Sequence, residues 1–214
     1  MKLKIAALAA AVMMSFSVFT ACSKSSDSSN NASAVSESQQ QFEKDYKNVP
    51  KIEDGPKLYV KDTTASPGEI AEVTLAVSNA DMKWNMCGIH LTFPNVLDCI
   101  NISDDVKDAE YITGDACRQA SAHIAMEWQK NLTEELERKR LGSVFFTATF
   151  NGNKGMDGDI ATFYFKIPEN AKSGATYDIG FYYSSTDIFS NEENNLSFQR
   201  YAFENWEGGT ITVK

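Results

Sequence analysis

Short runs in which apolar and polar residues alternate are the feature of this sequence that most restricts its fold. Between 71 and 78, for example, Val73, Leu75 and Val77 alternate with polar or small residues. Alternation with a period of two is typical of a strand that has one face in a core. Runs of this kind, separated by Pro, Gly, Asn and Asp, predict nine short strands, at 58–60, 71–78, 89–93, 96–102, 143–150, 160–167, 177–183, 196–203 and 209–213. We therefore expect an all-β fold, a nine-stranded β-sandwich of the jelly-roll or Greek-key type.

One segment lacks the strand pattern. Residues 132–141 are mostly charged, include good helix formers and contain neither Pro nor an internal Gly,. Asn131 is placed to cap a helix here, with Glu134 as its reciprocal partner three residues on. Glu135 and Lys139 have the spacing of a stabilising ion pair on a helix. The sequence thus predicts one short helix inserted between strands, with a disordered charged loop as the alternative.

The N-terminus has the pattern of a lipoprotein export signal. Two lysines precede an apolar run over 5–19, which is shorter than the roughly 20 residues that a membrane-spanning helix needs. Small residues then lead directly to Cys22, as in a lipobox, where the Cys is acylated and becomes the new N-terminus; Phe19 stands where Leu is usual,. We predict a signal peptide over 1–21 and a lipid on Cys22. An ordinary signal peptide cut near Ala21 is the alternative.

A flexible tether is predicted over 22–56. Its first part is rich in Ser, Asn and Gln, and such a composition cannot bury enough apolar area to offset the entropy of ordering the chain. Phe42, Tyr46 and Val49 are apolar residues that could dock weakly on the domain that follows, so the boundary stays open. We expect that domain to occupy 57–214.

Charge and motifs exclude several functions. The formal net charge is −9 at pH 7, which argues against binding to nucleic acid or to anionic lipid, so any membrane attachment would use the lipid alone. The two histidines, His90 and His123, are not part of an HExxH or CxxC pattern. We expect His90 to be a surface residue on the polar side of a strand. The sequence contains no G-x-S-x-G or Walker motif. We expect a binding protein without catalytic residues, metal or cofactor of its own.

Two further features have simple explanations. Cys87, Cys99 and Cys117 allow at most one disulfide, and burial as small apolar residues is the simplest account of them; whether any pair forms stays open. The loop 151–159 carries oxygen ligands at alternate positions, like the start of a calcium loop. Met and Thr occupy the two positions where an EF-hand has Gly and Glu. A plain hairpin loop is therefore expected.

Several motifs occur in a characteristic order. They are GIHLTFPNVLD at 88–98, GDIATFYFKI at 158–167, AKSGATY at 171–177 and GGTITV at 208–213. In this order they resemble the G-x-x-L-x-Y-D-P-x-V-L-E, D-G-x-x-A-T-x-x-F-K-V, A-x-x-G-x-Y and G-G-x-I-x-V patterns of cohesin modules, although the Asp before Pro is missing from the first. Cohesins are the domains that receive dockerins in cellulosome-type assemblies.

The resemblance implies a binding surface. In cohesins the dockerin helices lie across an outer sheet face, which carries over here to the segments near 86–92, 143–150, 158–166 and 195–202. The contact residues that this implies are Gly88, His90, Thr92, Val144, Phe146, Ile160, Thr162, Tyr164, Leu196 and Phe198. Coverage of this face by the segment 106–141 is the alternative.

Anchor and resemblance together imply an exported lipoprotein whose cohesin domain lies on the outer cell surface. It would be a monomer before it binds dockerin-bearing proteins, such as polysaccharide-degrading enzymes. Dockerins resemble paired EF-hands, so calcium is expected on the partner and not on this chain. The alternative is a surface glycan-binding sandwich in which Trp84, Trp128 and Trp206 stack on sugar rings.

Overall fold

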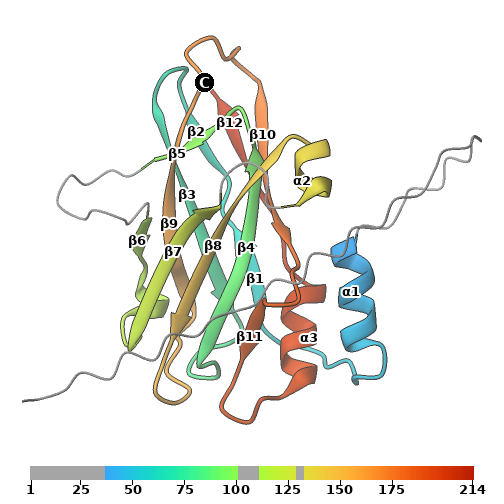
Figure 1. Cartoon of the computed structure of the whole chain (residues 1–214). Helices are drawn as coiled ribbons and strands as arrows, with labels where there is room; N and C mark the ends of the chain where they lie inside the picture. Colours follow the sequence, from blue (N-terminus) through green and yellow to red (C-terminus); the bar gives the residue numbers. More distant parts are fainter. Residues whose placement is uncertain (1–36, 101–110, 129–132) are drawn as a thin grey trace, which may run out of the picture. The chain divides into compact units, whose positions relative to one another are not determined.

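The computed structural model describes residues 37–100, 111–128 and 133–214, and in these the chain forms two β-sheets that enclose a shared core (Figure 1). The architecture is the predicted two-sheet sandwich, mostly β with a few short helices. The described residues form twelve strands, more than the nine expected, because several short edge strands lack a clear alternation. Within this part of the chain, no helix is long and apolar enough to cross a membrane.

The smaller sheet has five strands among the described residues. Its order is β1 (Lys57–Val60), β3 (Ile70–Ser78), β9 (Gly158–Lys166) and β5 (Asp98–Cys99), and β6 (Tyr111–Thr113) also pairs with β9. The strand pairs are antiparallel, and the register places Val73 opposite Phe163 and Leu75 opposite Ala161. Since residues directly opposite each other point to the same side, these side chains enter the core together.

The larger sheet has seven described strands. Its order is β2 (Thr63–Ala65), β12 (Gly209–Val213), β10 (Thr176–Tyr182), β4 (Met86–Pro94), β8 (Leu141–Thr149) and β7 (Ala122–Trp128), and β11 (Ile188–Ser190) also pairs with β4. β2 and β12 are parallel, and the other pairs are antiparallel. Strand β4 therefore has β8 along one edge and both β10 and β11 along the other.

Aromatic rings from both sheets fill the core. The Phe93 and Phe165 ring centroids are 4.8 Å apart, and Phe146 meets Phe163 edge-on at 6.2 Å. All four side chains are fully buried. The alternation of apolar residues on the predicted strands thus identified much of the core correctly, because the apolar face of each strand is the one that packs inward.

The inserted helix is α2 (Glu134–Arg138), shorter than predicted. Its N-cap is Thr133, whose Oγ1 accepts a hydrogen bond from Leu136 N at 3.2 Å, so the prediction of an Asn131 cap is wrong. The predicted pair between Glu135 and Lys139 is confirmed, with 2.6 Å between Oε1 and Nζ.

The strand predicted at 196–203 is wrong, because this segment is helix α3 (Leu196–Glu204). Asn195 caps the helix: its Oδ1 accepts hydrogen bonds from Ser197 N at 2.9 Å and Phe198 N at 3.3 Å. Phe198 and Ala202, four residues apart on one helical face, are buried in the core,. The aromatic content favoured a strand, whereas the Asn cap was the overlooked helix signal.

Helix α1 (Glu37–Tyr46) lies inside the predicted tether and packs beside α3 (Figure 1). Its Phe42 and Tyr46 rings are buried, and Phe42 meets Tyr183 edge-on at 5.1 Å. Tyr183 Oη donates a hydrogen bond to Asp45 Oδ2 at 2.9 Å. The predicted flexible stretch therefore does not extend to residue 56, and the docking of Phe42 and Tyr46 that the sequence left open does occur.

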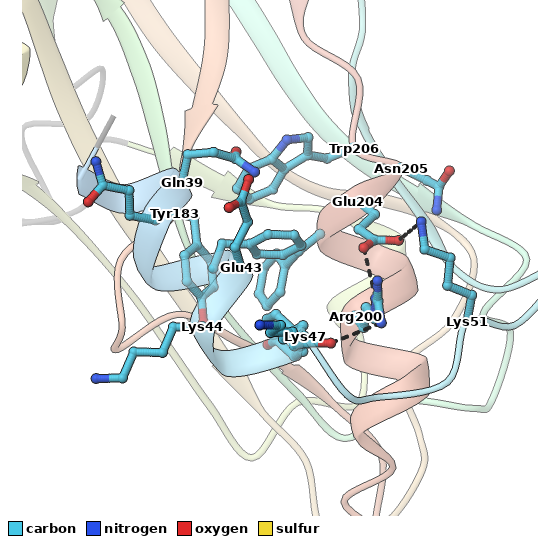
Figure 2. Close-up of a pocket in the computed structure, with 14 residues that line it drawn as sticks. Gln39, Glu43, Lys44, Lys47, Lys51, Tyr183, Arg200, Glu204, Asn205 and Trp206 are labelled. Atoms are coloured by element: carbon cyan, nitrogen blue, oxygen red, sulfur yellow. Dashed lines mark hydrogen bonds and ion pairs between the residues drawn. The ribbon is translucent and has the colours of Figure 1, made fainter. Parts of the chain in front are cut away.

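Figure 2 shows the groove between α1 and α3, which has a volume of about 1010 Å³. Arg200 crosses it: its guanidinium donates a hydrogen bond to Tyr46 O at 2.9 Å, another to Val49 O, and pairs with Glu204 at 2.8 Å. Glu204 also pairs with Lys51 at 3.3 Å. These bonds fix the chain just after α1 against the domain.

Docking holds α1 together, because a helix of this length is marginal on its own in water. Tyr46→Ala removes a buried ring, and we expect the docking of α1 to weaken by about 2–4 kcal/mol. Limited proteolysis should then cut the segment 37–56 faster than in the unaltered protein. Lys44→Ala, on the exposed side of the same helix, should leave the cleavage rate unchanged. Equal protection of both variants would show that α1 does not depend on this contact.

Candidate functional site

The outer surface of the larger sheet is set by the register of β4, β8 and β7. Ile89, Phe146 and Ala125 lie opposite one another and point into the core. The next row, Gly88, Thr147 and Ile124, must therefore face outward,. We use the term β8 face for the outward side chains around this row, namely those of Met86, Ile124, Phe145, Thr147, Thr149 and Ile188.

The β8 face is apolar with interspersed hydroxyls, and none of its six side chains is charged. Ile124 is 54% exposed, and Phe145, Thr147 and Ile188 are half-buried. Adjacent apolar side chains on an outer sheet face are a mark of an interaction surface.

Beneath the β8 face lies a buried pair of titratable groups. His90 Nδ1 and Asp187 Oδ1 are hydrogen-bonded at 2.6 Å, and the side chains are only 4% and 0% exposed. The imidazole packs on the Phe145 ring, 4.8 Å between centroids, and meets the Tyr182 ring edge-on at 6.5 Å. Burial raises the pKa of Asp187, and the hydrogen bond from His90 limits the rise.

Gly88 has no side chain, so the outward side chains of neighbouring strands can cover β4 at this position. A Cβ at this position would lie 3.1 Å from Ile188 Cγ2 and 3.4 Å from Phe145 Cζ. These distances are tight for a side-chain contact. The absence of a side chain thus lets Ile188 and Phe145 approach each other over the strand.

Solved structures show what this architecture resembles. A type III cohesin module from the cellulosomal ScaE cell-surface anchoring scaffoldin of Ruminococcus flavefaciens superposes with a TM-score of 0.63 at 24% sequence identity, over 77% of this chain and 93% of that chain. The fold is that of a cohesin module. No family model matches the sequence, and no curated protein matches it.

Cohesins solved with dockerins have the same fold. The OlpA cohesin of Clostridium thermocellum, in complex with a dockerin, matches with a TM-score of 0.52 at 12% identity, over 75% of this chain and 99% of that chain. The sixth cohesin of Acetivibrio cellulolyticus scaffoldin B, in complex with a Cel5 dockerin mutant, matches with a TM-score of 0.53 at 14% identity, over 75% and 99%. Identities this low show a shared fold.

The four segments expected to form one binding face do not share a sheet. In this cohesin fold β9 belongs to the smaller sheet, whereas β4 and β8 belong to the larger one. Thr162 and Tyr164 accordingly lie opposite Thr74 and Glu72 of β3, and Ile160 is fully buried. Alternation shows which side chains share a face of one strand, but it does not show to which sheet the strand belongs.

Val144 and Phe146 are also misplaced in the prediction, because both point into the core and are fully buried. Leu196 is exposed and Phe198 is buried on α3, where Phe198 stacks on Phe189 at 5.7 Å. Neither residue belongs to a strand.

Gly88, His90 and Thr92 do lie on the outer side of β4, as predicted. However, His90 is 3% exposed and Thr92 is 6% exposed, so neighbouring side chains cover them. The expectation of a surface-exposed His90 is therefore wrong. Sequence reasoning missed Ile124 and Ile188, because it predicted no strand over 122–128 or 188–190, where β7 and β11 lie.

The calcium-like loop has another role. It joins β8 to β9 in the opposite sheet, so it is not the hairpin that the sequence suggested. Asp157 attaches it to the chain just after β3: Oδ1 accepts a hydrogen bond from Ala80 N at 2.7 Å, and Oδ2 accepts one from Asn79 N at 3.1 Å. Among the described residues, no cluster of three or more His, Cys, Asp and Glu is arranged to hold a metal ion.

Cys87, Cys99 and Cys117 are buried thiols and form no disulfide with one another in the described domain. Burial raises the pKa of Cys117 to about 12 and that of Cys87 well above its ordinary value. A thiol with a pKa near 12 is ionised to roughly one part in ten thousand at pH 8, and the thiolate is the reactive form.

We therefore expect these thiols to resist a disulfide-exchange reagent at pH 8 in the folded protein. They should react within minutes once a denaturant unfolds the chain, because solvent then reaches the sulfur atoms and returns the pKa values of Cys87 and Cys117 to the ordinary range. Absorbance of the released chromophore measures both rates. Fast reaction of Cys87, Cys99 or Cys117 in the folded protein would contradict the burial of these side chains.

Proposed function

We propose that this chain is a lipid-anchored cohesin that binds dockerin-bearing proteins noncovalently through the β8 face. The observation that carries the proposal is the apolar, uncharged outer face of β8 and its neighbours on a cohesin fold. Dockerin binding is attributed to several structural neighbours, which were solved as cohesin–dockerin complexes. Polysaccharide-degrading enzymes are the proteins that we expect to carry the partner dockerin.

The dimensions of the β8 face suit a helix. Neighbouring strands lie about 4.8 Å apart, and a helix with its side chains is about 10–12 Å wide. A helix laid on the row Ile188, Thr147 and Ile124 would therefore meet β11, β8 and β7 together, with Gly88 of β4 covered beneath Ile188. The apolar side chains would lose contact with water, and the threonine hydroxyls would offer hydrogen bonds to the partner.

The glycan-binding alternative has weaker support. Trp84 is fully buried, and its Nε1 donates a hydrogen bond to Met156 O at 3.2 Å, so it cannot stack on a sugar. Trp206 is half-buried and stacks on Phe181 at 4.9 Å, which occupies one face of the indole. The side chain of Trp128 lies outside the described residues.

A matched pair of isoleucines tests the proposed surface. Ile124 on the larger sheet and Ile112 on the smaller sheet are 54% and 52% exposed. Ile124→Asp should weaken dockerin binding by about 10–100-fold, because it places a charge inside an apolar contact. Ile112→Asp should bind like the unaltered protein, although it lies beside Thr162 of the originally predicted surface.

Calorimetric titration of the full chain with a panel of dockerins, with calcium present, measures these affinities. A chelator should abolish binding, because it would remove the calcium that we expect the dockerin to carry. Loss of affinity in Ile112→Asp alone would move the binding surface to the smaller sheet. Absence of binding to every dockerin would rule out the proposed function.

The anchor is tested separately, because residues 1–36, including Cys22, lie outside the described residues. Cys22→Ser removes the thiol that would be acylated. We expect this variant in the culture medium, while Ser25→Ala stays with the cells. Fractionation followed by immunodetection distinguishes the two locations. Retention of Cys22→Ser in the membrane fraction would contradict lipid attachment at this residue.

A further inference from the structure

We propose that His90 and Asp187 are positioning residues for partner binding, which hold β11 on β4 so that the β8 face has the right shape. This inference rests on the proposed function, since the positioned surface is the one that would receive the dockerin. Both side chains are too deeply buried to touch a partner. They can therefore act only through the residues that surround them.

The pair lies where the strand pairing along one edge of β4 is interrupted. β10 pairs with β4 as far as Tyr182, opposite His90, and β11 resumes the pairing at Ile188, opposite Gly88. Between these points the chain leaves the sheet. Asp187 is the last residue before the chain returns to it, so its side chain is placed to join the two strands to β4.

Asp187 makes contacts on both sides of this interruption. Its Oδ2 accepts a hydrogen bond from Ser184 N at 3.2 Å, and its own N donates one to Ser184 O at 2.9 Å, so the turn is closed. The same carboxylate meets the His90 ring at 2.6 Å and accepts a longer hydrogen bond from His90 N at 3.4 Å. One side chain thus closes the turn and attaches it to β4.

The attachment determines where two apolar side chains of the β8 face lie. Ile188 directly follows Asp187 and covers Gly88. Phe145 packs on the imidazole of His90. The backbone of Asp187 thus positions Ile188, and the ring of His90 positions Phe145.

Stability alone is a poor explanation for such a pair. Burying two ionisable groups costs solvation free energy that their attraction often does not recover, and apolar residues of similar size can replace such pairs without loss of stability. A buried polar pair can instead specify one arrangement, because only one geometry satisfies its hydrogen bonds. Here that arrangement is the pairing of β11 with β4.

The test separates positioning from stability. We would prepare the full chain with His90→Leu, Asp187→Leu and both together. Each single variant breaks the hydrogen bond between the two side chains and should unfold at a lower temperature, whereas the double variant should regain part of the loss. The recovery is incomplete, because Ser184 N and His90 N also lose the carboxylate that accepts from them. The double variant should still bind a dockerin at least 10-fold more weakly, and amides of 188–190 should exchange hydrogen faster than in the unaltered protein.

The control is the hydroxyl pair of Thr74 and Thr162, 2.9 Å apart on the opposite sheet. Thr74→Val with Thr162→Val should leave both dockerin affinity and exchange at 188–190 unchanged. If the double Leu variant binds and exchanges like the unaltered protein, the positioning role is wrong.

Exchange also distinguishes this inference from the proposed function, since it needs no partner. If the unaltered protein binds no dockerin, the proposed function fails, and faster exchange at 188–190 in the double Leu variant would still support the role of the pair in holding β11. Unchanged exchange there would overturn that role whatever the affinities are.

Discussion

Strand β4 is the element on which the rest of the structure depends, because both its edges and both its faces are covered. Cys87, Ile89, Leu91 and Phe93 point into the core and are fully buried. Along one edge β4 pairs with β8 over nine residues, and along the other it pairs first with β10 and then with β11. Since β4 offers no free edge, its register fixes the positions of three neighbouring strands and of the outward side chains that they carry.

In this arrangement, the strand that holds the surface in place is not the one whose side chains a partner would touch. The outer side of β4 carries Gly88 and His90, which are buried. The apolar groups around them come from other strands, such as half-buried Ile188 of the neighbouring β11 and exposed Ile124 of β7, the strand beyond β8. A partner would therefore meet β7, β8 and β11, while β4 holds them in place. Helix α1 is connected to this sheet through Tyr183, which directly follows β10 and meets the ring of Phe42.

The sequence predicted local features well and long-range pairing poorly. Alternation identified the core side of β3, because that pattern depends only on one strand and the core beside it. It could not show that β9 pairs with β3 and not with β8, since this choice depends on the packing of distant segments,. The burial of His90 likewise depends on Asp187, which is distant in sequence. Helix α1 was missed because a helix of ten residues is marginal on its own and its stability comes from the docking of Phe42 and Tyr46,.

The most direct test of the account is a methyl NMR experiment on the domain with its isoleucine δ-methyl groups labelled. Saturation transferred from an unlabelled dockerin, in the presence of calcium, should reach Ile124 and Ile188 on the β8 face and should not reach Ile70 and Ile112 on the smaller sheet, although Ile70 and Ile112 are exposed. Transfer to Ile70 and Ile112, with none to Ile124, would place the partner on the opposite sheet and contradict the account.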